Sequence, residues 1–150
     1  MKTILIASDH AGFGLKEKIK PFLSKIGFKV NDLGTYSEDS CDYPEFAYKL
    51  AKAISLKKAP MGVLICKSGI GNSIAANKLP GVRAALVYNL KAAKLSRQHN
   101  DSNVLVLGSA FVPPALAKRI IKVWVATGFE GGRHKRRLDL IKKIERGIKK

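Results

Sequence analysis

Short apolar runs of strand length alternate with segments of helical period along the whole chain, and this alternation constrains the fold more than any other feature. Five runs rich in Val, Ile or Leu are predicted to be strands, at residues 3–7, 28–33, 62–66, 84–87 and 104–107. Strands that are apolar on both faces are typical of parallel sheets with helices on each side. The pattern predicts an α/β fold in which repeated βαβ units form a five-stranded parallel sheet.

The segments between these runs have the apolar spacing of helices. Helices are predicted at residues 14–25, 44–56, 73–78, 90–98, 114–127 and from 133 to the end of the chain. Pro44 suits the first turn of the second helix, and Asp42 suits its N-cap. The last helix carries one apolar stripe on a basic background, formed by Leu138, Ile141, Ile144 and Ile148. This stripe needs a surface to pack on, and the sequence leaves open whether that surface is the sheet or a second subunit.

A length of 150 residues is common for one domain, so residues 1–150 are expected to fold as a single unit with a basic helix over about 133–150. The apolar runs are far shorter than the roughly 20 residues that span a bilayer. The N-terminus also lacks the long apolar segment of a secretory signal. We therefore expect no membrane span and a cytoplasmic location. Cys41 and Cys66 are the only cysteines, and both are expected to be free thiols.

The charge is strongly positive: 28 Lys and Arg stand against 11 Asp and Glu, a net charge of +17. Such a balance attracts phosphates, nucleic acids or acidic surfaces without naming one of them. Nine of the basic residues lie between 133 and 150, so a solvated helix face is an ordinary explanation for part of the excess. A nucleic-acid-binding module is disfavoured, because aromatic residues do not interleave with the basic ones as a base-stacking surface requires.

Ligands of open parallel sheets bind outside the carboxyl ends of the strands. The first predicted strand runs into Ser8-Asp9-His10-Ala11-Gly12, which places a carboxylate and an imidazole at that edge. Such a pair is able to move protons. The plainer explanation is that Asp9 caps the following turn and that His10 is solvated.

The third predicted strand ends at Cys66, and a loop with two glycines, residues 67–73, leads into a helix. Glycines let backbone N–H groups turn inward, and a helix N-terminus adds positive charge, so the loop suits an oxyanion or phosphate. The same surroundings favour a thiolate, which is able to act as a base or nucleophile. The loop matches neither a Walker A motif nor a dinucleotide fingerprint, which disfavours ATP and NAD. Otherwise Cys66 is a small buried apolar residue.

Two further polar groups lie late in the chain. His99 and Asn100 follow the fourth predicted helix, where a solvated helix end is the simpler interpretation. Arg133 and Arg137 are four residues apart and share one helix face, as the two arms of a phosphate clamp do. The simpler interpretation of this pair is a basic helix end.

In this order the motifs resemble the B-type ribose-5-phosphate isomerases, whose family also includes the subunits of galactose-6-phosphate isomerase. The resemblance spans nearly the whole chain and rests on Ser8–Gly12 with Asp42-Tyr43-Pro44, on Cys66 with Ser68-Gly69-Ile70-Gly71, on 73–78, on Arg97 with 99–101, on 103–105, and on 131–134 with Arg137. It implies a Rossmann-like three-layer sandwich. It also implies a homodimer or dimer of dimers with sites between subunits, a small phosphorylated sugar as substrate, and neither metal nor cofactor.

The resemblance also implies a role for each site residue. Cys66 is the base that moves a proton between C2 and C1 through an enediolate, which Ser68 and the neighbouring N–H groups stabilise. His99, together with Asp9, shuttles the proton of ring opening. The full set of catalytic and substrate-binding residues is Asp9, His10, Tyr43, Cys66, Lys67, Ser68, Gly69, Ile70, Gly71, Ser73, His99, Asn100, Arg133 and Arg137, with the phosphate held by His10 and the two arginines.

Two positions depart from the family pattern. Lys67 stands where the family usually has Gly, and Ala110 stands where it commonly has Arg. The first change alters the catalytic loop, and the second removes a phosphate contact for which Arg136 or Lys67 is able to compensate. The expected reaction is the interconversion of ribose 5-phosphate and ribulose 5-phosphate. The alternatives are an isomerase of a six-carbon sugar phosphate and an inactive phosphosugar sensor.

Overall fold

Five parallel strands form one sheet in the order β2-β1-β3-β5-β4 in the computed structural model, which describes residues 1–148. The strands are β1 (Thr3–Ser8), β2 (Lys29–Asp32), β3 (Met61–Cys66), β4 (Ala84–Leu86) and β5 (Val104–Gly108). The helices are α1 (Phe13–Lys25), α2 (Tyr43–Ser55), α3 (Ile70–Ala76), α4 (Leu90–Gln98), α5 (Pro114–Ala126) and α6 (Arg133–Gly147). The predicted α/β fold with its parallel sheet is confirmed.

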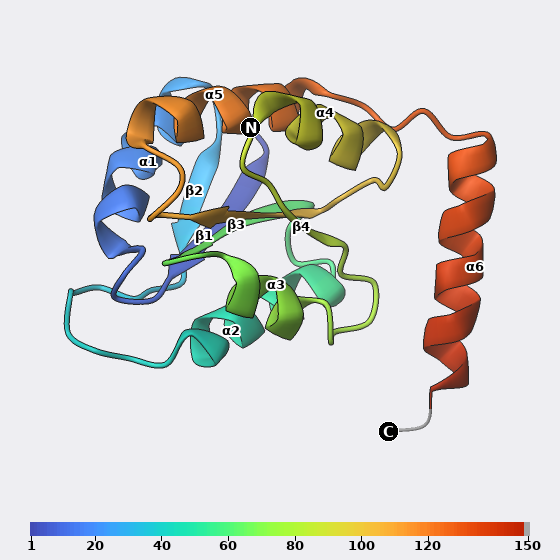
Figure 1. Ribbon diagram of the computed structural model, residues 1–150, viewed down its shortest axis with the longest axis horizontal. Coiled ribbons are helices and arrows are strands. Elements are labelled where there is room, and N and C mark those ends of the chain that lie inside the picture. The colour runs from blue at the N-terminus through green and yellow to red at the C-terminus, as the bar shows by residue number, and fades with distance from the viewer. Residues whose placement is uncertain (149–150) are drawn as a thin grey trace.

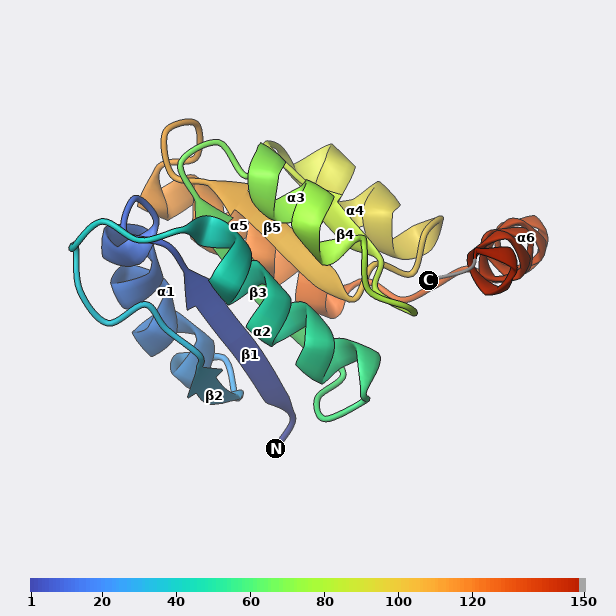
Figure 2. The ribbon, with the colours of Figure 1, turned by 90° about the horizontal axis from the view of Figure 1, so that it is seen from below.

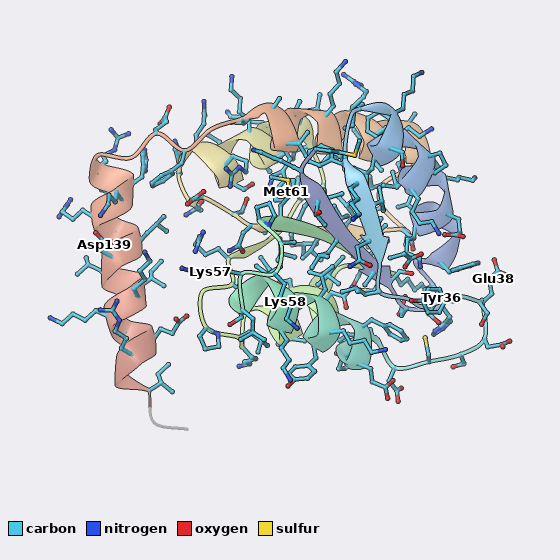
Figure 3. All side chains as sticks on the ribbon, turned by 180° about the vertical axis from the view of Figure 1, so that it is seen from behind. Tyr36, Glu38, Lys57, Lys58, Met61 and Asp139 are labelled. Carbon is cyan, nitrogen blue, oxygen red and sulfur yellow. The ribbon has the colours of Figure 1, made fainter. Side chains whose placement is uncertain are left out.

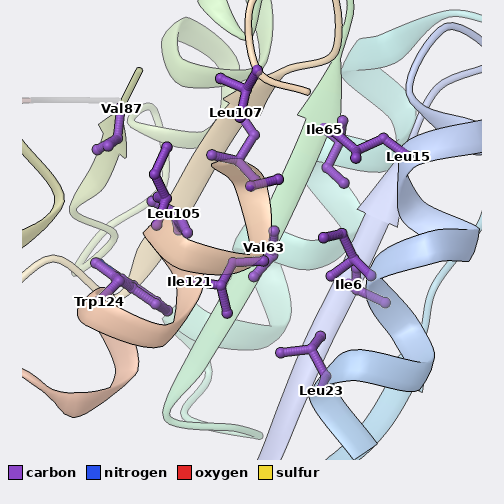
Figure 4. Packing of buried hydrophobic residues seen from close by; sticks show 14 of the residues in the cluster. Ile6, Leu15, Leu23, Val63, Ile65, Val87, Leu105, Leu107, Ile121 and Trp124 are labelled. Atoms are coloured by element: carbon purple, nitrogen blue, oxygen red, sulfur yellow. The ribbon is translucent and has the colours of Figure 1, made fainter. Parts of the chain in front are cut away.

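Helices cover both faces of the sheet and make three layers (Figure 1). Alternate strand residues point to opposite faces, so Ile4 and Ile6 pack with α1, α4 and α5, whereas Leu5 and Ala7 pack with α2 and α3. Figure 4 shows the first of these two cores, in which Trp124 of α5 lies beside Leu105. Both faces are apolar because both are buried, which explains the continuous apolar runs of the strands.

The termini of several elements differ slightly from the sequence prediction. The helix predicted at 73–78 begins earlier, at Ile70, because the chain turns into α3 directly after Gly69, whose φ of +84° is left-handed. The last helix was predicted to run to the end of the chain. It ends at Gly147, Ile148 has extended backbone, and residues 149–150 lie outside the described residues.

The helix α6 stands apart from the three layers (Figures 1 and 2). Figure 3 shows its side chains projecting on several sides, Asp139 among them. The N–H of Gly81 donates to the Glu145 carboxylate at 3.1 Å, but Ile141 and Ile144 of the apolar stripe are 53% and 67% exposed. The stripe therefore does not cover the sheet. None of the helices in residues 1–148 is long and apolar enough to cross a membrane.

Candidate active site

A cavity of about 460 Å³ opens at the carboxyl edge of the sheet, at the ends of β1 and β3. These strands are neighbours and pair in parallel, so the residues that follow them meet there. The cavity is lined by Asp9, Tyr43, Cys66, Lys67, Ser68, Ile70, Gly71 and Ile74. A larger hollow of about 640 Å³ near the end of α2 is lined by lysines and Arg83 but by no cysteine, histidine or carboxylate of the described chain. The smaller cavity therefore carries the candidate chemistry.

Cys66 is the nucleophilic group of this cavity. It is the last residue of β3, its side chain is 5% exposed, and the backbone N–H of Gly69 donates to its Sγ at 3.2 Å. The left-handed backbone of Gly69 makes this contact possible, and a Cβ there would lie 2.5 Å from Leu86 Cδ1. A donated N–H stabilises a thiolate more than a thiol. The Cys66 thiol is therefore placed to act as a base that is buried except where it borders the cavity.

Further hydrogen bonds hold the loop after Cys66. Ser68 Oγ accepts from the N–H of Ile70 at 3.1 Å, and its carbonyl accepts from the Tyr88 hydroxyl at 2.8 Å. Gly71 lies close to the ring of Tyr43: a Cβ on Gly71 would lie 2.4 Å from the Cε1 and Cζ atoms of Tyr43. Tyr43 therefore forms a wall of the cavity, and only glycine fits beneath it.

Asp9 and His10 are both held by backbone groups. Asp9 Oδ1 accepts from the N–H of Gly12 at 3.0 Å, so the turn-capping role is present, while the same residue lines the cavity. Nδ1 of His10 accepts from the N–H of Cys41 at 3.2 Å. A neutral His10 therefore carries its proton on Nε2, the nitrogen left free to donate to a ligand.

The second group of predicted residues lies at the opposite edge of the sheet. The helix α4 runs back from the carboxyl edge, and His99 is its C-cap. The N–H of Glu130 donates to the Gln98 carbonyl at 3.1 Å, which places the start of α6 near the same end of α4. The length of a five-residue strand, roughly 15 Å, separates this edge from Cys66. One chain therefore does not bring His99, Asn100, Arg133 and Arg137 to Asp9 and Cys66.

His99 forms a compact cluster with two residues that the sequence analysis gave no role. The rings of His99 and His134 stack with centroids 4.2 Å apart and an interplanar angle of 11°. Glu130 Oε1 lies 3.5 Å from His134 Nε2 and 3.9 Å from His99 Nε2. Burial, followed by the neighbouring His99 and Arg133, lowers the pKa of His134 below its ordinary value of 6.5. His134 is therefore a neutral imidazole at neutral pH.

Asn72 is another residue that the sequence analysis missed. It is fully buried in α3, one turn before the buried Ala76, and neither amide atom has a hydrogen-bond partner within residues 1–148. Buried amides are usually paired. The only signal in the sequence was the position of this amide directly after the glycine loop.

The two departures from the family pattern lie side by side. Lys67 is exposed and lines the cavity, so its side chain does not crowd the interior of the loop. The N–H of Ala110 donates to the Lys67 carbonyl at 2.9 Å. A cation at 67 thus stands next to the position where the family commonly has Arg.

Comparisons with known proteins identify the family of the chain. The ribose-5-phosphate isomerase B of Escherichia coli is 46% identical over 145 residues, which cover 97% of each chain. The structure of the Clostridium thermocellum ribose-5-phosphate isomerase B superposes with a TM-score of 0.94 at 46% identity, covering 96% of this chain and 97% of that one. The Mycoplasma genitalium ribose-5-phosphate isomerase B with bound ribulose-5-phosphate has a TM-score of 0.93 at 43% identity, with 97% of each chain covered. The sequence model described as ribose/galactose isomerase matches residues 4–141, and the chain belongs to this isomerase family.

Proposed function

We propose that the protein interconverts ribose 5-phosphate and ribulose 5-phosphate, with Cys66 as the base. The observation that carries this proposal is the Cys66 thiol, which borders the cavity at the carboxyl edge and receives an N–H from Gly69 at 3.2 Å. The bound ribulose-5-phosphate of the Mycoplasma genitalium relative supports a five-carbon substrate.

The reaction begins with the open-chain aldehyde. The Cys66 thiolate removes the C2 proton, and the electron pair of that C–H bond forms the C1=C2 double bond while the C1 carbonyl oxygen becomes an enediolate oxygen. The thiol then returns the proton to C1, while the proton of the C2 hydroxyl passes to the C1 oxygen, so that C2 becomes the ketone and C1 carries the hydroxyl. The N–H groups of Gly71 and Asn72 and the Ser68 hydroxyl stabilise the enediolate as charge develops on it. Neither a metal ion nor a cofactor takes part.

Ring opening is the task of His99, which moves a proton between the ring oxygen and the C1 hydroxyl of ribose 5-phosphate. Asp9 assists His99 in this proton transfer, Tyr43 and Asn100 orient hydroxyl groups, and Lys67 lines the cavity. His10, Arg133 and Arg137 hold the phosphate, since N–H donors from two segments of the chain are able to bind it from several sides.

The active chain is a homodimer in which each site combines the Cys66 edge of one subunit with the His99 edge of its partner. The separation of these edges within one chain supports this arrangement, and so does the exposed apolar stripe of α6. In a dimer with two-fold symmetry each subunit offers the same surface to the other, so the two shared sites form together. Association of such dimers in pairs is compatible with the same sites.

The first experiment is turnover of ribose 5-phosphate by the purified protein without added metal, with allose 6-phosphate and galactose 6-phosphate in parallel. Formation of ribulose 5-phosphate is the expected result. Turnover of a six-carbon sugar alone would replace the proposed substrate. Phosphosugar binding without exchange of the C2 proton for solvent deuterium would contradict the enzymatic proposal and identify a sensor.

A further inference from the structure

The cluster of His99, Glu130 and His134 has the composition of a zinc site. Its ligand atoms, two imidazole nitrogens and one carboxylate oxygen, lie within 4.8 Å of one another. Imidazole and carboxylate are zinc ligands, and three protein ligands with an open fourth position are a common arrangement. The three residues come from the end of α4, the loop after α5 and the start of α6.

The buried imidazole supplies a second observation that points to a ligand. His134 is 7% exposed, and its Nε2 has no hydrogen-bond partner within the described part of the chain. A buried polar atom without a partner is costly, and a bound cation would satisfy it.

The distances between the three ligand atoms are close to those of a zinc site, so zinc binding requires little movement of the side chains. Tetrahedral bonds of about 2.1 Å place ligand atoms about 3.4 Å apart, and Glu130 Oε1 already lies 3.5 Å from His134 Nε2. The His99 contact of 3.9 Å must shorten, and the stacked rings must tilt toward a common point. The side chains that need to move are the exposed ones, because His99 is 39% and Glu130 50% exposed. Arg133 and Arg137 lie nearby and oppose a cation, so a modest affinity is expected.

We propose that His99, Glu130 and His134 bind one Zn²⁺ per chain and that bound zinc inhibits the enzyme by occupying His99. The binding stands on the geometry alone, whereas the inhibition rests on the proposed function. Zinc bonded to Nε2 of His99 takes the lone pair that accepts a proton during ring opening. The Cys66 edge keeps its base, so only the ring-opening step is lost.

Binding is measured by competition between the chelator-treated protein and a chromophoric zinc chelator. One zinc per chain is expected, and Glu130→Gln and His134→Asn should each raise the Kd at least about tenfold by removing a ligand. Glu38→Gln is the matched control, since Glu38 lies in the loop before α2, far from α6 (Figure 3). Cys66→Ala should still bind one zinc, and Mg²⁺ should not compete because it prefers all-oxygen sites. Absence of zinc binding, equal binding by Glu130→Gln, or loss of binding in Cys66→Ala would overturn the proposal.

Inhibition is tested with the two substrates separately. Ribulose 5-phosphate has no free O5 and cannot close a furanose ring, so exchange of its C1 proton for solvent deuterium does not need His99. Zinc should slow the conversion of ribose 5-phosphate while this exchange continues, and Glu130→Gln should relieve the inhibition. Equal loss of both reactions would place the inhibitory zinc at Cys66 and overturn the proposal. A protein that turns over neither substrate without zinc would contradict the proposed function, while the chelator titration would still decide the zinc site.

Discussion

At the level of single residues, Cys66 has the largest role in the proposed mechanism, because it removes the proton from C2 and returns it to C1. Cys66→Ala should lower kcat by about 10²- to 10⁴-fold, the usual cost of losing a general base. Folding should persist, because alanine fits where the thiol is buried. Ribose 5-phosphate turnover and deuterium exchange at C2 are the measurements.

The second cysteine offers the matched control for this substitution. Cys41 contacts His10 mainly through its backbone N–H, and its Sγ lies 3.9 Å from the imidazole. Cys41→Ala should therefore keep its activity. Substantial exchange by Cys66→Ala would show that another group is the base.

The predictability of the site depends on the range over which its residues interact. Cys66, Ser68 and Gly69 were predicted because a strand end, a glycine loop and a helix start are consecutive in sequence. Glu130 and His134 received no role because their cluster needs the end of α4 brought against the start of α6. The burial of Asn72 was equally hidden, since it depends on how α3 packs against the sheet.

The buried ion pair between Lys16 and Asp32 leads to a testable prediction about stability. Lys16 is fully buried, and its Nζ lies 2.6 Å from Asp32 Oδ1. Burial alone would raise the pKa of Asp32, but hydrogen bonds from Lys16 and Lys20 outweigh it and hold the pKa below the ordinary value of 3.8. The stabilisation is therefore present above the unfolded-state pKa and is lost as the pH falls through the lower folded-state pKa.

Asp32→Asn should lower the free energy of unfolding at pH 7 by about 3–5 kcal/mol, because it leaves the Lys16 charge buried without its partner. The difference from the wild type should shrink as the pH falls below about 3.8. Urea unfolding at fixed protein concentration measures both effects. Asp139→Asn is the control, because its partner Lys135 is exposed and the pair is solvated. Equal losses in the two variants would contradict the assigned role of Asp32.

At the level of elements, two glycines near the start of α1, Gly12 and Gly14, allow the effect of packing on stability to be distinguished from the effect of helix propensity. A Cβ on Gly12 would lie 2.5 Å from the Ile65 carbonyl oxygen of β3, whereas a Cβ on Gly14 would meet nothing within 4 Å. Gly12→Ala should lower the free energy of unfolding by about 1–3 kcal/mol because the helix must move away from the strand. Gly14→Ala should raise it by up to about 1 kcal/mol by helix propensity. Paired urea unfolding curves measure the difference, and similar curves would contradict the close approach of α1 to β3.

The elements themselves were predictable for a related reason. Strands such as 62–66 and helices such as 114–127 are signalled by local apolar spacing, which the layered packing preserves. The predicted start of α3 was wrong because the turn depends on Gly69, whose left-handed backbone has no signal beyond the residue type. The sequence likewise showed the apolar stripe of α6 but not which surface it faces, since that depends on an arrangement outside the helix.

At the level of the whole molecule, α6 is the element that a single chain leaves partly uncovered: His134 and Leu138 near its start are buried, whereas Ile141 and Ile144 are exposed. Ile144→Asp should weaken dimer formation, because Ile144 is 67% exposed in one chain and a carboxylate would be buried at the proposed interface. Sedimentation at several concentrations should show more monomer, with parallel loss of isomerase activity. Lys143→Asp, on another face of α6, is the control for added negative charge. An unchanged dimer in Ile144→Asp would exclude this residue from the interface.

If each site is shared between two subunits, a mixture of two inactive variants should recover activity. Cys66→Ala and His99→Asn each remove one half of every site in their own homodimers. In a hybrid dimer, one site combines the intact Cys66 of one chain with the intact His99 of the other, and the second site has lost both. An equal mixture, refolded together, should recover about one quarter of the wild-type rate, since half of the random dimers are hybrids with one working site of two. The control is Cys66→Ala mixed with the double variant Cys66→Ala/His99→Asn, which has no intact site in any combination. Recovery confined to the first mixture requires that the two edges of the sheet meet across the interface, whereas no recovery would place the complete site within one chain.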